Sequence, residues 1–174
     1  IKKAFSPLTL ISETDSTSIK IIAVSDLLVD TTVEIQVKEF DERGNQLAAY
    51  QLPFTFKANS AARLTTIPIF QSNASVIRFL LCSHNKCIHE YDVKLPNKSL
   101  DKATNILIQS LNDTTIQVSV DKGFAEYVAL ASNIYTFDDN YFNLIVGEPK
   151  LIHVNAKSPV DITKIRAFFI PLKN

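Results

Sequence analysis

Apolar and polar residues alternate with a period of two along most of this chain. Val33, Ile35 and Val37 alternate with polar side chains, and the same pattern recurs at residues 116–120. Because successive side chains of a strand point to opposite faces of a sheet, this pattern predicts strands with one face on a core and the other in water. The apolar spacing of three and four residues that is typical of helices is almost absent, so we expect an all-β protein.

The predicted strands fall into two groups of about six, which is the number that a small sandwich needs. Turn-forming residues separate them at 41–45, 57–60, 83–86, 112–114 and 121–123. The first group covers residues 18–25, 31–40, 46–53, 61–67, 76–82 and 88–94. The second covers residues 106–111, 115–120, 125–131, 135–137, 150–154 and 167–172.

A polar stretch containing Pro96 separates the two groups, and a proline removes a donor from a strand ladder. We therefore predict two tandem immunoglobulin-like β-sandwich domains, residues 1–97 and 98–174. The one helical segment that we predict is about one turn long and lies around residues 158–165, where Ser158 could be its cap and Pro159 could occupy the first helical position.

Charge and composition exclude several classes of partner. The chain has 18 basic and 18 acidic residues, so it offers no basic field for nucleic acid or for an anionic membrane surface. Its longest apolar runs, such as residues 167–170, fall far short of the roughly 20 residues of a transmembrane helix. Because the chain contains no Met, we expect the natural polypeptide to begin upstream of Ile1.

Catalytic and cofactor-binding motifs are not found. The 3 glycines, at positions 44, 123 and 147, form neither a hydrolase nucleophile elbow nor a phosphate-binding loop. Gly147, Glu148 and Pro149 favour a turn rather than a catalytic carboxylate, because glycoside hydrolysis needs two carboxyl groups opposed across a sugar. The sequence therefore predicts no catalytic residue and no cofactor.

Two cysteines and two histidines lie close together at Cys82, His84, Cys87 and His89. Three interpretations remain open: a zinc site, a disulfide between Cys82 and Cys87 across a hairpin, or two ordinary thiols. The spacing argues against zinc, because a hairpin turn at residues 83–86 sends the imidazoles away from the facing cysteines. A disulfide would indicate an oxidising compartment, periplasmic or extracellular.

Oxygen-bearing side chains are densest at Asp138, Asp139, Asn140 and Asn143. Such a loop can bind calcium, but the glycine and glutamate spacing of an EF-hand is missing, so a hydrogen-bonded loop is the simpler interpretation. His153 lies between two apolar residues of a predicted strand, which favours a half-buried strand position over a ligand or base.

Residues 124–130, 137–144 and 147–150 follow an order and spacing that resemble a known family. An aromatic strand containing Tyr127 is followed by a phenylalanine, an Asp-Asn pair, a second phenylalanine and a Gly-Glu turn. This order is similar to that of the terminal immunoglobulin-like domain of β-mannosidases in glycoside hydrolase family two, although Asp138 stands where the family more often has serine. The motif residues, which we interpret as structural, are Asp139, Asn140, Phe142, Gly147 and Glu148.

The first half of the chain resembles the preceding domain of the same enzymes, a sandwich described as immunoglobulin-like or carbohydrate-module-like. The likeness rests on residues 23–26, 32–37, 40–44 and 57–60, which are general features of β-sandwiches.

The resemblance implies a parent enzyme that cleaves terminal β-linked mannose with retention, on a (β/α)₈ barrel. None of that barrel lies in these residues, and the family's Asn-Glu-Pro acid/base motif does not occur here. We therefore expect a non-catalytic C-terminal accessory region that acts as a scaffold for the barrel of the same polypeptide.

Two alternatives belong to other functional classes. A carbohydrate-binding module would stack surface rings, of which Tyr50, Tyr91 and Tyr141 are the candidates, on β-mannoside glycans. The absence of Trp weakens this alternative, and Phe54, Phe56 and Phe79 alternate in the manner of core residues. A free-standing adhesion or interaction module would have the same fold.

Overall fold

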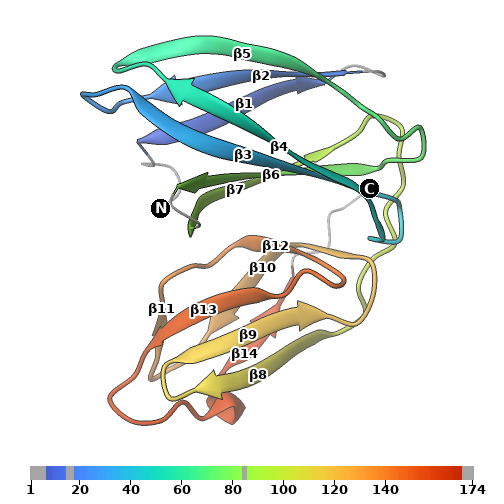
Figure 1. Ribbon diagram of the computed structural model, residues 1–174. Coiled ribbons are helices and arrows are strands. Elements are labelled where there is room, and N and C mark those ends of the chain that lie inside the picture. The colour runs from blue at the N-terminus through green and yellow to red at the C-terminus, as the bar shows by residue number, and fades with distance from the viewer. Residues whose placement is uncertain (1–6, 15–17, 84–85, 170–174) are drawn as a thin grey trace. The chain divides into compact units, whose positions relative to one another are not determined.

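The computed structural model describes residues 7–14, 18–83 and 86–169 of the chain, and it is built almost entirely of antiparallel strands. The predicted all-β fold class is confirmed. The chain divides into two compact units, residues 1–42 with 46–99 and residues 43–45 with 100–174 (Figure 1). Our boundary between residues 97 and 98 stays a prediction. No helix within the described residues is long and apolar enough to cross a membrane.

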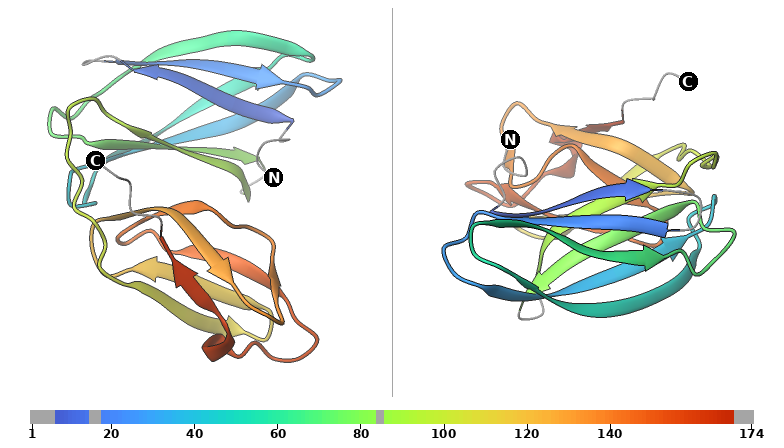
Figure 2. Two further views of the ribbon diagram at one scale, coloured as in Figure 1. Left: turned by 180° about the vertical axis from the view of Figure 1, so that it is seen from behind. Right: turned by 90° about the horizontal axis from the view of Figure 1, so that it is seen from above.

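The first unit is a sandwich of two sheets (Figure 2). One sheet has the order β1-β2-β5, formed by Leu8–Thr14, Ser18–Ser25 and Ser60–Pro68. The other has the order β4-β3-β6-β7, formed by Gln46–Phe56, Thr31–Phe40, Val76–Ser83 and Lys86–Lys94. Alternate residues of both sheets meet in one core, which includes Ile19, Ile21, Ile35, Val37, Phe56, Phe79 and Leu81.

The second unit repeats this architecture with shorter strands. One sheet has the order β12-β10-β14, formed by Phe142–Ile145, Phe124–Ala131 and Arg166–Phe168. The other has the order β11-β13-β9-β8, formed by Thr136–Phe137, Lys150–Asn155, Thr115–Val120 and Ile106–Asn112. The core between these sheets includes Ile116, Val118, Val128, Leu130, Phe142, Leu144, Ile152 and Val154.

The sequence prediction missed two strands, β1 and β12. In β1 the alternation is broken, because Leu8 and Leu10 are buried while the adjacent Ile11 is 49% exposed. Strand β12 is only four residues long and follows the polar loop at 138–141. The last predicted strand ends at Phe168 in the structure, and residues 170–172 of that prediction lie outside the described residues.

The helical turn predicted within residues 158–165 is present, but its predicted cap is wrong. The structure has a single 3₁₀ turn, η2 (Ile162–Lys164), and its N-cap is Asp161 rather than Ser158. The Asp161 carboxylate accepts hydrogen bonds from the Thr163 amide at 2.9 Å and from the Thr163 hydroxyl at 2.6 Å. These bonds from Thr163 hold the pKa of Asp161 below its ordinary value.

A buried carboxylate anchors the segment that follows β5. Glu39 on β3 is fully buried and accepts hydrogen bonds from the backbone amides of Phe70 and Gln71, at 3.1 and 3.0 Å. The ring of Tyr50 on β4 packs edge-on against Phe70, with 5.1 Å between centroids. Burial, and secondarily the charge of Glu39, raises the pKa of the Tyr50 phenol. The Tyr50 hydroxyl is buried with no hydrogen-bond partner among the described residues.

A second carboxylate organises the start of the second unit. Asp121 accepts hydrogen bonds from the backbone amides of Thr104 and Asn105, at 3.0 and 3.1 Å, and from the Asn105 side chain at 3.0 Å. These hydrogen bonds lower the pKa of Asp121 to about 2, and the bond from the Asn105 backbone amide has the largest effect. The carboxylate thus ties the segment before β8 to the turn after β9.

We expect Tyr50→Phe to stabilise the first unit by about 1 kcal/mol, because it removes a buried hydroxyl that has no partner. The matched control is Tyr91→Phe, since the Tyr91 hydroxyl pairs with the Ser12 hydroxyl at 3.2 Å. This control should lose up to about 1 kcal/mol. Urea unfolding measures both changes, and a clear loss of stability in Tyr50→Phe would contradict the assignment.

We expect the stabilisation by Asp121 to depend on pH. Its pKa is about 2 in the folded chain, below its ordinary value of 3.8, so protonation favours the unfolded state. The stabilisation is complete above about pH 4 and is lost as pH falls through about 2. The melting temperature of wild type should therefore exceed that of Asp121→Asn at pH 7, and the difference should shrink toward pH 2. A difference that does not change between these pH values would overturn this explanation.

Candidate functional site

The motif residues gather around the edge of β12 in the second unit. Phe142 lies within β12 and is 1% exposed, so its ring is part of the core. Asp139 and Asn140 lie in the loop before this strand, and Gly147 and Glu148 lie in the turn after it. The structure therefore places the motif along one continuous segment that leads from β11 to β13.

The Asn140 side chain pairs with the backbone of β10 just beyond the end of β12. Strands β10 and β12 pair at Val128 and Phe142, and continuing this antiparallel register brings Leu130 opposite Asn140. The Asn140 side-chain oxygen accepts the Leu130 amide at 2.7 Å, and its amide nitrogen donates to the Leu130 carbonyl at 2.9 Å. A side-chain amide thus satisfies the backbone of β10 where the strand partner has ended.

Asn143 compensates for an irregularity in the same strand. The register of β10 shifts between Ala125 and Val128, and Tyr127 has a φ of +54° in this bulge. The Tyr127 amide donates to the Asn143 side-chain oxygen at 3.1 Å. A bulge leaves a backbone group unpaired in the ladder, and here an asparagine supplies the acceptor.

Lys150 joins the loop to the core. Its ammonium lies 3.2 Å from the Asp139 carboxylate and 5.2 Å from the centroid of the Phe142 ring. Asp139 also accepts the Asn140 amide at 2.8 Å. An ion pair and a cation–π contact thus hold Asp139, Phe142 and Lys150 together.

Gly147 and Glu148 form the tight turn between β12 and β13. Gly147 has a φ of +79°, which a glycine adopts without strain. The Glu148 amide donates to the Ile145 carbonyl at 3.0 Å and closes the turn. This geometry agrees with a role for Gly147 and Glu148 in chain reversal.

The oxygens of the 138–143 loop face backbone amides of their own unit. Asp138 accepts the His153 amide at 2.8 Å, and its own amide donates to the His153 carbonyl at 3.0 Å. The oxygens of this loop thus serve as hydrogen-bond acceptors, in agreement with the hydrogen-bonded loop that the sequence favoured over a calcium site. Across the described part of the chain, no three His, Cys, Asp or Glu side chains form a group that could hold a metal ion.

Cys82 and Cys87 are joined by a disulfide at the end of the β6–β7 hairpin. The two residues face each other in the register of the hairpin, with Cys82 buried and Cys87 exposed. His84 lies outside the described residues. The zinc interpretation would require both thiols, which the disulfide occupies.

The three tyrosines predicted as sugar-stacking rings lie in different settings. Tyr50 and Tyr91 are half-buried and pack against the core of the first unit. Tyr141 in the second unit is 64% exposed, and its φ of +61° turns the chain just before β12. Among the three, Tyr141 alone presents most of its ring to solvent, and its role in sugar binding stays a prediction.

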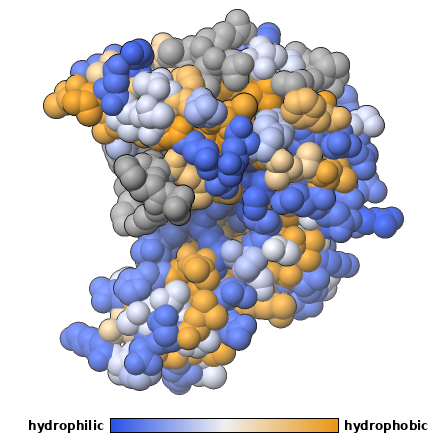
Figure 3. All heavy atoms as spheres, in the orientation of Figure 1, coloured by the Kyte–Doolittle hydropathy of each residue, from blue (hydrophilic) through white to orange (hydrophobic). Residues whose placement is uncertain are grey.

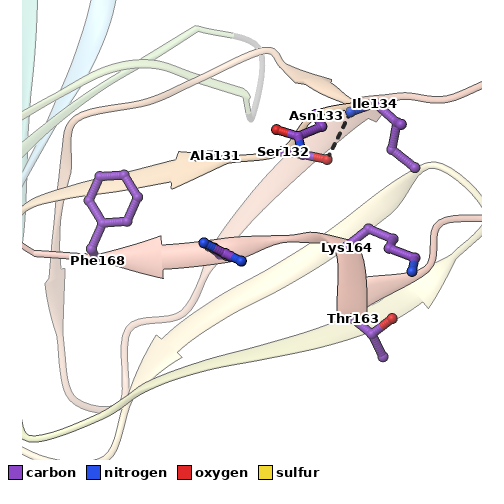
Figure 4. A pocket seen from close by; sticks show the side chains of 8 residues that line it. Ala131, Ser132, Asn133, Ile134, Thr163, Lys164 and Phe168 are labelled. Atoms are coloured by element: carbon purple, nitrogen blue, oxygen red, sulfur yellow. Dashed lines mark hydrogen bonds between the residues drawn. The ribbon is translucent and has the colours of Figure 1, made fainter.

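Sequence reasoning missed an open hollow of about 700 Å³ in the second unit (Figure 4). Strand β14 lines one side with Arg166 and Phe168, and Lys164 and Thr163 extend this side into η2. The segment 131–134 lines the other side. Figure 4 shows the half-exposed Phe168 ring at one end of the hollow and the side chains of Thr163 and Lys164 at the other, so the hollow offers an aromatic ring, a hydroxyl and a cationic group to a sugar or another polar ligand. No sequence signal pointed here, because the two segments lie about 30 residues apart in the chain.

We expect Asn140→Ala to destabilise the second unit by about 2 kcal/mol, because it leaves the Leu130 amide and carbonyl without partners. The matched control is Asn133→Ala, an exposed asparagine of the same unit, for which a change within about 0.5 kcal/mol is expected. Native-state hydrogen exchange adds a local measurement: the Leu130 amide should lose protection in Asn140→Ala and keep it in the control. Equal effects of the two substitutions would contradict this role of Asn140.

Comparison with solved structures places the whole chain in a known architecture. The crystal structure of a β-D-mannosidase from Dictyoglomus thermophilum is similar with a TM-score of 0.73 and 15% identity, over 97% of this chain and 22% of that one. The exo-chitosanase CsxA from Amycolatopsis orientalis is similar with a TM-score of 0.63 and 13% identity, over 97% of this chain and 26% of that one. This chain thus spans about a quarter of the length of these structures.

No curated protein matches the chain by sequence. At identities of 13–15% the structural likeness establishes the fold alone. A family model described as the mannosidase Ig-fold domain matches residues 95–167, a segment that contains the whole motif. Residues 95–167 are therefore an Ig-fold domain of the mannosidase type, which confirms for this part of the chain the resemblance that its sequence predicted.

Proposed function

We propose that this chain is a non-catalytic accessory region of a β-mannosidase-like glycoside hydrolase. In this proposal it packs against a catalytic (β/α)₈ barrel of the same polypeptide, and the retaining cleavage of β-mannosides takes place on that barrel. The family match supports the proposal, and so does the share of the two similar enzymes that the chain spans.

The observation that carries the proposal is what the motif residues do in the fold. Asn140 pairs with the backbone of Leu130, Asp139 and Lys150 form an ion pair, and Phe142 lies in the core. The most specific part of the sequence thus maintains a sandwich edge. Such structural residues are expected in a domain that has no catalytic role of its own.

The native polypeptide should be much larger than 19.4 kDa, the mass of this chain. An antibody raised against the chain can be used to probe a lysate of the source organism and to follow β-mannoside hydrolysis through purification. We expect a large band that co-purifies with the activity, whereas the isolated chain should hydrolyse no β-mannoside. A native band near 19.4 kDa would overturn the accessory role.

Carbohydrate binding is the second candidate, and the hollow beside Phe168 favours it. Its open shape and its mixture of an aromatic ring with hydroxyl and cationic groups suit a saccharide. Titration of the isolated chain with manno-oligosaccharides should then shift the amide signals of residues 131–134 and 163–168. A matched titration of Phe168→Ala should abolish the shifts, and unchanged spectra in the wild type would exclude this role. Shifts centred on Tyr141 would move the site to that ring.

A further inference from the structure

The short stretch of chain that contains β14 presents an aromatic ring and two cations along one side. Ile165 and Ala167 turn inward and pack against the core of the second unit. Because side chains alternate along an extended chain, Lys164, Arg166 and Phe168 project to the opposite side. All three line the hollow described above, and Figure 4 shows Phe168 and Lys164 at its two ends. The hollow therefore has a ring, a guanidinium and an ammonium in one row.

Small side chains on β10 keep the hollow open beside this row. In the register of the β10–β14 pair, Ala131 lies opposite Arg166 and Ala129 lies opposite Phe168. Directly opposite residues of an antiparallel pair share one face of the sheet, and the methyl groups of these alanines leave the space above it free. The hollow of about 700 Å³ lies within the range of roughly 300–1,000 Å³ that is typical of small-molecule sites.

Exposed apolar side chains alone do not distinguish the hollow from other surfaces of the second unit. Figure 3 shows such side chains over β9 and β13, on the other sheet, as well. The hollow differs in its charge. Its lining combines Phe168 with the cations Lys164 and Arg166, and among the described residues that line it there is no Asp or Glu. A concave site of one sign of charge attracts ligands of the opposite sign.

The net positive charge of the hollow resides mainly on Arg166. This side chain is exposed, and within the described part of the chain it forms no ion pair. Lys164 is partly neutralised by Asp161, the cap of η2. Hydrogen bonds from Thr163, and secondarily the charge of Lys164, hold the pKa of Asp161 below its ordinary value. A guanidinium binds a carboxylate through two parallel hydrogen bonds, so Arg166 suits this anion well.

We propose that the hollow binds a saccharide that bears a carboxylate, a hexuronic acid unit, more tightly than the matching neutral sugar. The sugar ring packs on Phe168, and its carboxylate accepts hydrogen bonds from Arg166, which lies about 6.6 Å further along the strand. Lys164 adds attraction at longer range, and the Asn133 side chain across the hollow bonds to sugar hydroxyls. This proposal rests on the second candidate function, carbohydrate binding, and names the class of saccharide.

The test is a titration of the isolated chain with two trisaccharides that differ in one group on each ring. β-1,4-Linked mannotriose carries a hydroxymethyl group where β-1,4-linked trimannuronate carries a carboxylate. Dissociation constants come from the amide signals of residues 131–134 and 163–168. We expect trimannuronate to bind at least about fivefold more tightly at low salt, a modest gain because both cations are exposed. The ratio of affinities should approach one in about 0.5 M NaCl, because salt screens exposed charges.

Two substitutions test the assigned cation. Arg166→Gln should reduce the ratio of affinities to below about twofold, because it removes the guanidinium that binds the carboxylate. The matched control, Lys122→Gln, removes an exposed lysine from the turn after β9 and should leave the ratio nearly unchanged. Because both side chains are exposed, the melting temperatures of the two variants should stay near that of wild type.

The possible failures can be told apart. A ratio below about fivefold in wild type, a ratio that salt does not change, or equal effects of Arg166→Gln and Lys122→Gln would overturn the preference for an acidic sugar while leaving carbohydrate binding intact. Inorganic phosphate that binds as tightly as trimannuronate would identify a site for small anions and overturn the saccharide. If neither trisaccharide shifts the signals of the hollow, carbohydrate binding fails together with this proposal, and the accessory role is unaffected.

Discussion

Burial of alternate aliphatic side chains between two facing sheets is the interaction on which each unit of this protein depends. Ile35 and Val37 on one sheet meet Ile19 and Ile21 on the other, and Ile116, Val118, Ile152 and Val154 do the same in the second unit. Each fully buried side chain of this size contributes about 1.5–3 kcal/mol. Other features of the structure, including its loops and polar contacts, serve to keep these two layers in register.

Polar side chains complete the sheets where the strands stop or shift. The Asn140 side chain accepts the Leu130 amide where β12 has ended, and the Asn143 side chain accepts the Tyr127 amide in the bulge of β10. In the first unit, the Glu39 carboxylate accepts backbone amides of the segment that follows β5. Asn140 and Glu39 accept partly buried backbone amides, and Asn143 accepts the exposed amide of the bulge. Asn140 and Asn143 thus complete the irregular edge of the second sandwich, in the segment that the mannosidase Ig-fold model matches.

The two faces of the β11-β13-β9-β8 sheet lie in different environments. The inner face supplies the core, and the outer face presents Leu107 and Leu151 together with polar side chains, among them the exposed His153.

The sequence by itself determined the all-β class, most of the strands and the structural character of the motif loop, because period-two alternation and turn residues are local signals. It could not reveal β1 or β12, where the alternation breaks or the strand is very short, and it placed a helix cap on Ser158 that belongs to Asp161. Only the tertiary structure decided which backbone groups Asn140 and Asn143 satisfy, that Lys150 turns inward, and that residues 131–134 and 163–168 line one hollow. The physical reason is that these contacts join residues distant in the chain, and their partners are fixed by strand order and register rather than by neighbouring residues.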